Sequence, residues 1–423
     1  MLDQEVSAIE REYTRLTPTS ASLMTRASES MPHGITRTLS WFRPYPVVFD
    51  HGKGSNLYDV DDNRYVDLFS NGLSLMHGHN YGPIREALEV ALARGTAWPG
   101  TSDAQIQFAE LLCSRVPGAE QVRFTNTGTE ATMLGVKLAR HVTGKQLILK
   151  AWHGYHGSYD DLEVGLLGQG EMPGRVALAT FGDISTYKAQ FERHAGEIAA
   201  VIVEPVQYTG VVTEPPDGFL AELQKLTADA GALFVMDDCL MFRLAEGGTV
   251  ERYGLEPADI TCLGKFIGGG LPVGAIGASA EMMATFHPSP DAEGAMYHGG
   301  SFNGNVLGMV AGDVAVRHLT AAAIERLDGV ADALRARIQA AAEERGVSVQ
   351  TKGVGSAFGL YVLDGPGGEI DWPATSMLQL ASATHGVYYG SGGEFGLNTA
   401  LTEDDVDRAV AGISSALSDL AGS

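Results

Sequence analysis

The sequence of 423 residues contains only three cysteines, Cys113, Cys239 and Cys262, and none of them stands in a CxxC spacing. A scattered, odd-numbered set predicts neither a disulfide framework nor a zinc site. No apolar run approaches the ~20 residues that a membrane-spanning helix needs. The first fifteen residues mix acids and bases and hold no apolar segment of the secretory kind. We therefore expect no membrane partner and a cytoplasmic location.

Basic residues are also scarce, because 29 lysines and arginines face 52 aspartates and glutamates, which gives a net charge of -23. Nucleic acids and anionic membranes repel such a surface, so we expect neither as a partner. The hydrophobic content of 44% and the 53 glycines are typical of a folded α/β protein with many strand-to-helix turns. The length is sufficient for two domains.

Between about residues 105 and 310, short apolar runs alternate with helical patterns. This alternation predicts a mostly parallel sheet with both faces covered by helices, with strands at 146–149, 175–180, 199–204, 232–237 and 260–263. Ligands bind such sheets at the carboxyl ends of the strands. Glu204, Asp237 and Lys265 each close or immediately follow one of the runs.

The two ends of the chain predict a smaller domain. We expect an entry helix at 3–15, a hairpin within 56–68 and a helix at 84–93, with His77 and His79 as loop residues. A helical stretch at 306–319 runs on into 321–345 and predicts one long connecting helix. Strands at 355–362 and 386–389 and a helix at 403–420 follow. The predicted domains are a large one at 66–315 and a small one built from 1–65 and 316–423.

Lys265 stands between an apolar run and the glycines of 268–270, which is an unusual place for a lysine. A partly buried lysine is pushed towards its neutral form, and a neutral amine can form a Schiff base with an aldehyde. The ordinary alternative is a lysine that ends a strand.

Three further motifs allow both a functional and an ordinary interpretation. Residues 127–129 open a helix and offer free N–H groups to a phosphate, or they form a plain N-cap. Tyr155 can stack on a flat heteroaromatic ring or cap the core. Asp237, at the end of a buried strand, needs a positive partner such as a protonated ring nitrogen, unless it caps a helix.

Taken together, the four motifs match the contacts that pyridoxal 5'-phosphate requires, namely a phosphate site, a stacking ring, a carboxylate and a lysine. Other phosphate motifs are absent. No GxxxxGK[ST] sequence occurs, and Phe358 stands where a dinucleotide fingerprint at 353–358 needs its last glycine. These absences count against a P-loop nucleotidase and a nicotinamide dehydrogenase.

From about Met31 to its end, the chain resembles the class III, fold-type I pyridoxal-phosphate aminotransferases. The resemblance is carried by residues 123–131, 154–157, 203–206, 262–270 and 300–305. Within that family the chain is most similar to glutamate-1-semialdehyde aminomutases and β-phenylalanine-type aminotransferases. The resemblance implies a large α/β domain with a mostly parallel sheet of the seven-stranded type, a smaller α+β domain and a homodimer with shared active sites.

The resemblance also implies a role for individual residues. Lys265 would form the Schiff base, Asp237 would meet the ring nitrogen, and Tyr155 would lie on one ring face. Arg37 would hold a substrate carboxylate, for which a bidentate guanidinium is suited. The phosphate would be bound by Thr127, Gly128 and Thr129, and by Ser301 of the neighbouring subunit, while His156, Glu204 and Cys239 are further expected cofactor contacts.

The sequence departs from the family at two positions. Cys239 replaces the valine that packs under the cofactor ring. In the segment 390–395 the arginine of a second acid-binding site is missing, and Glu394 lies nearby. An acidic residue there would repel an α-keto acid, so an amine-bearing or carrier-bound substrate remains open.

The function predicted from these residues is amino transfer between a β- or otherwise non-standard amino acid and a keto or aldehyde acceptor. The freed Lys265 amine would carry the proton. An intramolecular aminomutase of the glutamate-1-semialdehyde type is the first alternative, and a racemase or decarboxylase follows. If Lys265 forms no Schiff base, a non-catalytic regulator that binds a phosphate ligand remains.

Overall fold

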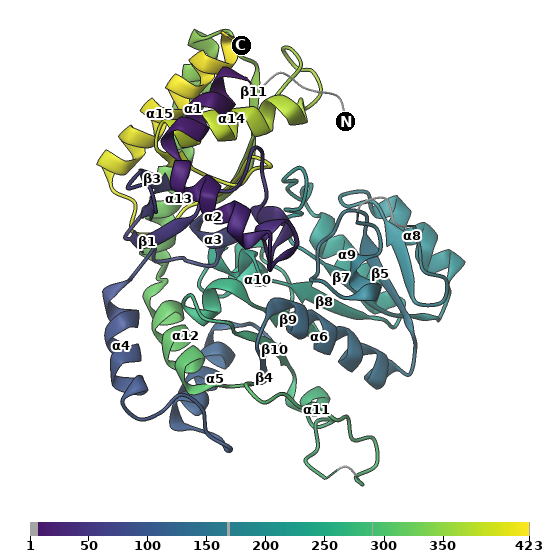
Figure 1. The fold of residues 1–423 in the computed structure, drawn as a ribbon. Coiled ribbons are helices and arrows are strands. Elements are labelled where there is room, and N and C mark those ends of the chain that lie inside the picture. Colours follow the sequence, from purple (N-terminus) through teal and green to yellow (C-terminus); the bar gives the residue numbers. More distant parts are fainter. Residues whose placement is uncertain (1–6, 167–169, 290, 423) are drawn as a thin grey trace. The chain divides into compact units, whose positions relative to one another are not determined.

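The computed structural model describes residues 7–166, 170–289 and 291–422 (Figure 1). The chain divides into two compact units. Unit 1 holds the described residues up to Tyr81 and those from Glu325 onward, and unit 2 is Gly82–Ile324. The sequence-based boundaries at 65/66 and 315/316 stay a prediction.

Unit 2 is built on a seven-stranded sheet. Its strands, in spatial order, are β4 (Gln121–Thr125), β10 (Gly274–Ala278), β9 (Ile260–Leu263), β8 (Leu233–Asp237), β7 (Ile198–Val203), β5 (Leu147–Ala151) and β6 (Val176–Ala179). β10 is antiparallel to both of its neighbours, and the other pairs are parallel. The expected mostly parallel sheet is therefore confirmed.

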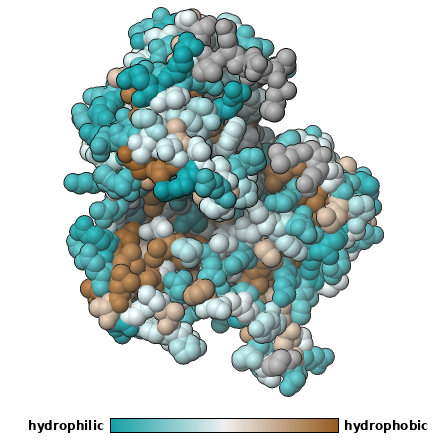
Figure 2. Space-filling model, viewed as in Figure 1, coloured by the Kyte–Doolittle hydropathy of each residue, from teal (hydrophilic) through white to brown (hydrophobic). Residues whose placement is uncertain are grey.

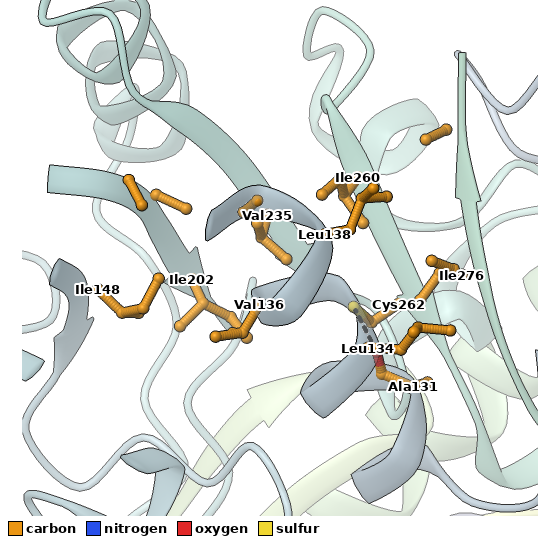
Figure 3. Packing of buried hydrophobic residues seen from close by; sticks show 14 of the residues in the cluster. Ala131, Leu134, Val136, Leu138, Ile148, Ile202, Val235, Ile260, Cys262 and Ile276 are labelled. Carbon is orange, nitrogen blue, oxygen red and sulfur yellow. Dashed lines mark hydrogen bonds between the residues drawn. The ribbon is translucent and has the colours of Figure 1, made fainter. Parts of the chain in front are cut away.

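Helices cover both faces of this sheet, because alternate residues of a buried strand point to opposite sides. Ile148, Ile202 and Val235 pack on one face against Leu134 and Leu138 of α6 (Gly128–Thr143) (Figure 3). On the same face the Cys262 thiol lies 3.7 Å from the Ala131 carbonyl oxygen. The opposite face packs against α8 (Ile184–Arg193) and α9 (Phe219–Asp229), through Tyr187, Phe219, Leu220 and Leu223.

The remaining helices of unit 2 are α4 (Gly82–Leu92), α5 (Asp103–Arg115), α7 (Asp160–Glu163), α10 (Gly248–Tyr253), α11 (Ala280–Met283) and α12 (Val306–His318), with the 3-10 turns η3 (Met241–Leu244) and η4 (Lys265–Gly268). On the face shown in Figure 2, hydrophobic residues gather around α4 and α12. Val90 and Leu92 of α4 are 68% and 52% exposed.

Unit 1 contains two small sheets. The first has the order β1 (Phe49–Lys53), β2 (Asn56–Asp59), β3 (Arg64–Asp67) and β13 (Val387–Tyr388), and the second has β11 (Val349–Val354), β12 (Ala357–Val362) and β14 (Glu394–Gly396). Its helices are α1 (Ala8–Leu16), α2 (Pro18–Ala27), α3 (Ser70–Leu73), α14 (Trp372–Thr384) and α15 (Glu403–Ala421), with η1 (Pro32–Gly34) and η2 (Thr38–Ser40). α13 (Ala321–Glu344) begins at the border of the units.

The expected long connecting helix is wrong. α12 ends at His318 and α13 begins at Ala321, and the two are bent by 74°. The Thr320 hydroxyl accepts the N–H of Ala323 at 3.3 Å, so a new helix cap interrupts the pattern.

Within the described ranges, no single helix is long and apolar enough to cross a membrane, although the bent pair α12 and α13 passes by length and composition alone.

Candidate active site

The expected site residues gather at one edge of the sheet in unit 2. β4, β9, β8, β7 and β5 run in the same direction, so their carboxyl ends lie at the same edge. β9 leads to Lys265, β8 ends at Asp237 and β7 leads to Glu204. β4 leads into α6, and β5 leads into a loop, residues 152–159, that carries Tyr155 and His156.

The turn between β4 and α6 is shaped to bind an anion. Thr127 is the N-cap of α6, and its hydroxyl accepts the N–H of Glu130 at 3.1 Å. The N–H groups of Gly128 and Thr129 belong to the first turn and have no partner inside the helix. They point outward at the positive end of the helix dipole. The N-cap and the phosphate interpretations are therefore compatible.

The loop after β5 is docked on the same helix. The Thr132 hydroxyl donates to the His156 carbonyl oxygen at 2.6 Å, and the Ser158 N–H donates to the Thr129 hydroxyl at 3.3 Å. Gly157 has a φ of 95°, and a Cβ there would lie 2.5 Å from the Thr129 hydroxyl oxygen. Only glycine allows this close approach, which fixes the loop beside the phosphate turn.

Glu204 orients the backbone of Tyr155. The Tyr155 N–H donates to Glu204 Oε2 at 2.9 Å, and the tyrosine ring is half-buried. Burial and the nearby Asp237 raise the pKa of Glu204 to about 8. Glu204 is therefore mostly protonated at neutral pH and acts as a hydrogen-bonding group.

Asp237 and His156 form a buried pair. His156 Nδ1 lies 2.8 Å from Asp237 Oδ2, and the Cys239 N–H donates to Oδ1 at 3.2 Å. Burial raises the pKa of Asp237, but the hydrogen bonds from His156 and Cys239 and the charge of Lys265 bring it below its ordinary value. Burial lowers the pKa of His156. The pair is thus a carboxylate and a neutral imidazole whose Nδ1–H is the donor.

Lys265 has a backbone conformation that few lysines adopt. Its φ is 54°, in the left-handed region, which costs about 1–3 kcal/mol in a non-glycine residue and is concentrated at functional sites. The side chain is half-buried, and the residue follows β9, whose Cys262 is paired with Asp237 at the end of β8.

Cys239 packs between two glycines of the site. A Cβ on Gly128 would lie 3.0 Å from the Cys239 sulfur, and one on Gly264 would lie 3.3 Å from it. Burial raises the pKa of the thiol well above its ordinary value, so it stays protonated. A protonated, buried thiol is not a nucleophile, and Cys239 fills space here.

Ser301 and Arg37 are the two remaining predicted site residues. Ser301 is exposed, and its segment is tied to the phosphate turn because Asn126 Nδ2 donates to Asn303 Oδ1 at 2.8 Å. Arg37 in unit 1 is exposed and donates to Asn71 Oδ1 at 3.0 Å.

Glu394, the second departure from the family, is half-buried in unit 1. Burial raises the pKa of its carboxyl group, and the Gly392 N–H donates to it at 3.0 Å. The substrate roles of Arg37 and Glu394 stay predictions.

Sequence reasoning missed Lys150. This lysine lies inside β5, is 0% exposed and donates to three loop carbonyl groups. A lysine within an otherwise apolar run was the signal that could have identified it. Among the described residues, no group of three or more His, Cys, Asp or Glu could hold a metal ion.

The residues fit a cofactor that carries a phosphate, an aromatic ring with a protonated nitrogen and an aldehyde. Asp237 meets His156 at Oδ2 and the Cys239 N–H at Oδ1, and a carboxylate can accept about four hydrogen bonds. His156 Nε2 is buried without a partner. The N-terminus of α6 suits the phosphate, and the amine of Lys265 suits the aldehyde.

Comparison with known proteins agrees with this arrangement. Residues 40–399 match the family model of class-III aminotransferases. The chain is 34% identical over 428 residues to the β-phenylalanine transaminase of Variovorax paradoxus, which covers 98% of this chain and 96% of that protein. It is 35% identical over 419 residues to glutamate-1-semialdehyde 2,1-aminomutase 2 of Bacillus thuringiensis (strain Al Hakam), and the match covers 93% of this chain and 96% of that protein.

Among solved structures, a transaminase with pyridoxal phosphate bound has a TM-score of 0.90 and 30% identity, and the match covers 96% of this chain and 98% of that one. The predicted fold class and the resemblance stated from the sequence are confirmed.

Proposed function

Because this chain belongs to the class-III aminotransferases, we propose that it moves the amino group of a β- or otherwise non-standard amino acid to a keto or aldehyde acceptor. It is an enzyme that depends on pyridoxal 5'-phosphate. The observation that carries the proposal is Lys265, held at a φ of 54° after β9, the strand that pairs with β8 and its terminal Asp237.

The chain has residues that would bind each part of the cofactor. The N–H groups of Gly128 and Thr129 would bind the phosphate, with the hydroxyl of Thr127 beside them. Asp237 would accept a hydrogen bond from the ring nitrogen, and Tyr155 would lie against the ring. Lys265 would hold the aldehyde carbon covalently, since Lys150 uses all its donors elsewhere.

When bound, the cofactor supplies an electron-withdrawing ring that weakens the bonds to the amino-bearing carbon of the substrate. The ionised Asp237 keeps a proton on the ring nitrogen, and the neutral His156 fixes the direction of that carboxylate. The freed amine of Lys265 would carry the proton between the substrate carbon and C4′ of the cofactor. The protonated Glu204 keeps Tyr155 in place without adding a second buried charge.

The donor class is proposed from the similarity to a β-phenylalanine transaminase and from Arg37, whose guanidinium is suited to a carboxylate. Glu394 would disfavour an α-keto acid as acceptor. The 35% identity to an aminomutase supports a second candidate, in which the amino group returns to the same molecule.

We also propose a homodimer with shared active sites. Large hydrophobic side chains are exposed on unit 2, and Tyr297 (81%) and Phe302 (63%) flank Ser301 in sequence. A neighbouring subunit would cover such a surface and bring its own Ser301 to the phosphate. The cytoplasmic location stays a prediction.

The test is the absorption spectrum of the loaded enzyme before and after addition of single amino acids. We expect a β-amino acid to convert the visible band to the near-ultraviolet band of the aminated cofactor, with release of a carbonyl product. An unchanged band together with an isomerised substrate would favour the aminomutase. A protein that takes up no cofactor would contradict the proposal.

A further inference from the structure

Lys150 is a lysine in the middle of the hydrophobic sheet. It belongs to the strand Leu147–Ala151, all of whose residues are buried, and its own exposure is 0%. Its Nζ donates to the carbonyl oxygens of Gly154 at 2.8 Å, Leu162 at 2.5 Å and Val164 at 2.7 Å. A lysine ammonium has three donors and no acceptor, so every donor is used.

The three carbonyl groups belong to the chain that leaves β5, and between them lie Tyr155 and His156. One side chain therefore ties both the beginning and the end of this segment, residues 152–164, to the centre of the sheet. Between residues 155 and 158 the segment is held by side chains of other elements, namely Glu204, Thr132, Thr129 and Asp237. Without Lys150, three buried carbonyl groups would lose their donor.

Acidic groups nearby oppose the effect of burial on Lys150. Burial lowers its pKa to about 8, while the charges of Glu204, Asp237 and Glu163 act in the opposite direction. The ammonium is thus retained at neutral pH. Lys150 is a buried cation whose three donors are occupied, which excludes it from covalent chemistry.

We propose that Lys150 is a positioning residue for the cofactor, which holds segment 152–164 in the binding conformation before the cofactor arrives. The inference rests on the proposed cofactor roles of Tyr155 and Asp237. A segment that is already ordered adds no ordering cost to binding, so the cofactor binds more tightly. A lysine that served stability alone would change the unfolding midpoint and leave the affinity of the folded protein unchanged.

The experiment compares Lys150→Met with Lys145→Met. Lys145 also donates to a backbone carbonyl group, that of Gly231 at 2.7 Å, but this hydrogen bond is exposed and lies outside the segment. Pyridoxal phosphate is titrated into each cofactor-free protein, and urea unfolding confirms that each is folded. We expect the dissociation constant of Lys150→Met to rise on the order of tenfold to a hundredfold, and that of Lys145→Met to stay unchanged. Equal affinities of Lys150→Met and the unmodified protein would overturn the inference.

Lys150→Gln provides a graded variant, because its amide keeps two N–H donors without the charge. We expect its affinity for pyridoxal phosphate to lie between those of Lys150→Met and the unmodified protein. If neither Lys150 variant folds, hydrogen exchange of the unmodified, cofactor-free protein decides. The Tyr155 amide, bonded to Glu204, should be protected, and exchange at the rate of an unstructured chain would overturn the inference. Failure of the unmodified protein to bind pyridoxal phosphate would instead contradict the proposed function.

Discussion

Glu204 provides a quantitative test of the buried carboxyl pair, through the variant Glu204→Gln. Glutamine has the same shape, and its amide oxygen can still accept the Tyr155 N–H that Glu204 Oε2 accepts at 2.9 Å. It cannot titrate. Burial also raises the pKa of Asp238 to about 7 and lowers that of Lys150 to about 8. Both groups are present in the two proteins, so the comparison isolates the proton on Glu204.

The sign and size follow from the pKa values. Burial and Asp237 raise the pKa of Glu204 from 4.5 to about 8 in the folded protein. Between these values the folded state binds more protons than the unfolded state. The stabilisation is complete below the unfolded pKa and is lost as the pH rises through the folded pKa. Relative to that of Glu204→Gln, the free energy of unfolding of the native protein should fall by roughly 1.4 kcal/mol per pH unit between about pH 5.5 and 7.5.

Urea unfolding of both cofactor-free proteins at about pH 5.5, 6.5 and 7.5 measures this difference, with each protein's own m value. A difference in unfolding free energy that stays constant with pH would refute the reasoning, because Glu204 would then titrate alike in the folded and unfolded chain.

Three further substitutions follow from the same contacts. Asp237→Asn should lower turnover by at least about a hundredfold while the protein still folds, because the amide oxygen can accept the His156 N–H; near-native rates would contradict the role of the charge. Gly264→Ala should lower the unfolding free energy by about 1–3 kcal/mol, because the new Cβ would lie 3.0 Å from Gly128 Cα. An unchanged melting temperature would contradict this crowding. Gly329→Ala, inside α13 with nothing within 4 Å of its Cβ, should raise the unfolding free energy by about 0.5–1 kcal/mol, and a loss of stability would argue against the helix.

The sequence predicted the sheet where its strands carry large apolar side chains. The five apolar runs correspond to β5, β6, β7, β8 and β9 within one or two residues. β10 was missed because Gly274–Ala278 is a run of small residues with a single isoleucine. Small residues are required there, since a Cβ on Gly274 would lie 2.2 Å from the Thr127 carbonyl oxygen and one on Gly277 would lie 2.7 Å from Ala119. Contacts of this kind are visible only in three dimensions.

The candidate site was predictable as far as polar residues follow strand ends. The positions of Asp237, Glu204 and Lys265 after buried strands, and of residues 127–129 before a helix, were readable from the pattern. The partners of these residues were not. His156 meets Asp237 across 81 residues, and Lys150 joins three carbonyl groups through side-chain length and burial. No sequence spacing encodes such pairings.

The most direct test of the account is the position of the covalent bond between the enzyme and its cofactor. The loaded protein is reduced with borohydride and digested, and the peptide that carries the added cofactor mass is identified. We predict the modification on Lys265 and none in the variant Lys265→Ala, whose unfolding midpoint serves as the control for folding. Modification of Lys150 or another lysine, with Lys265 unmodified, would contradict the assignment of the site.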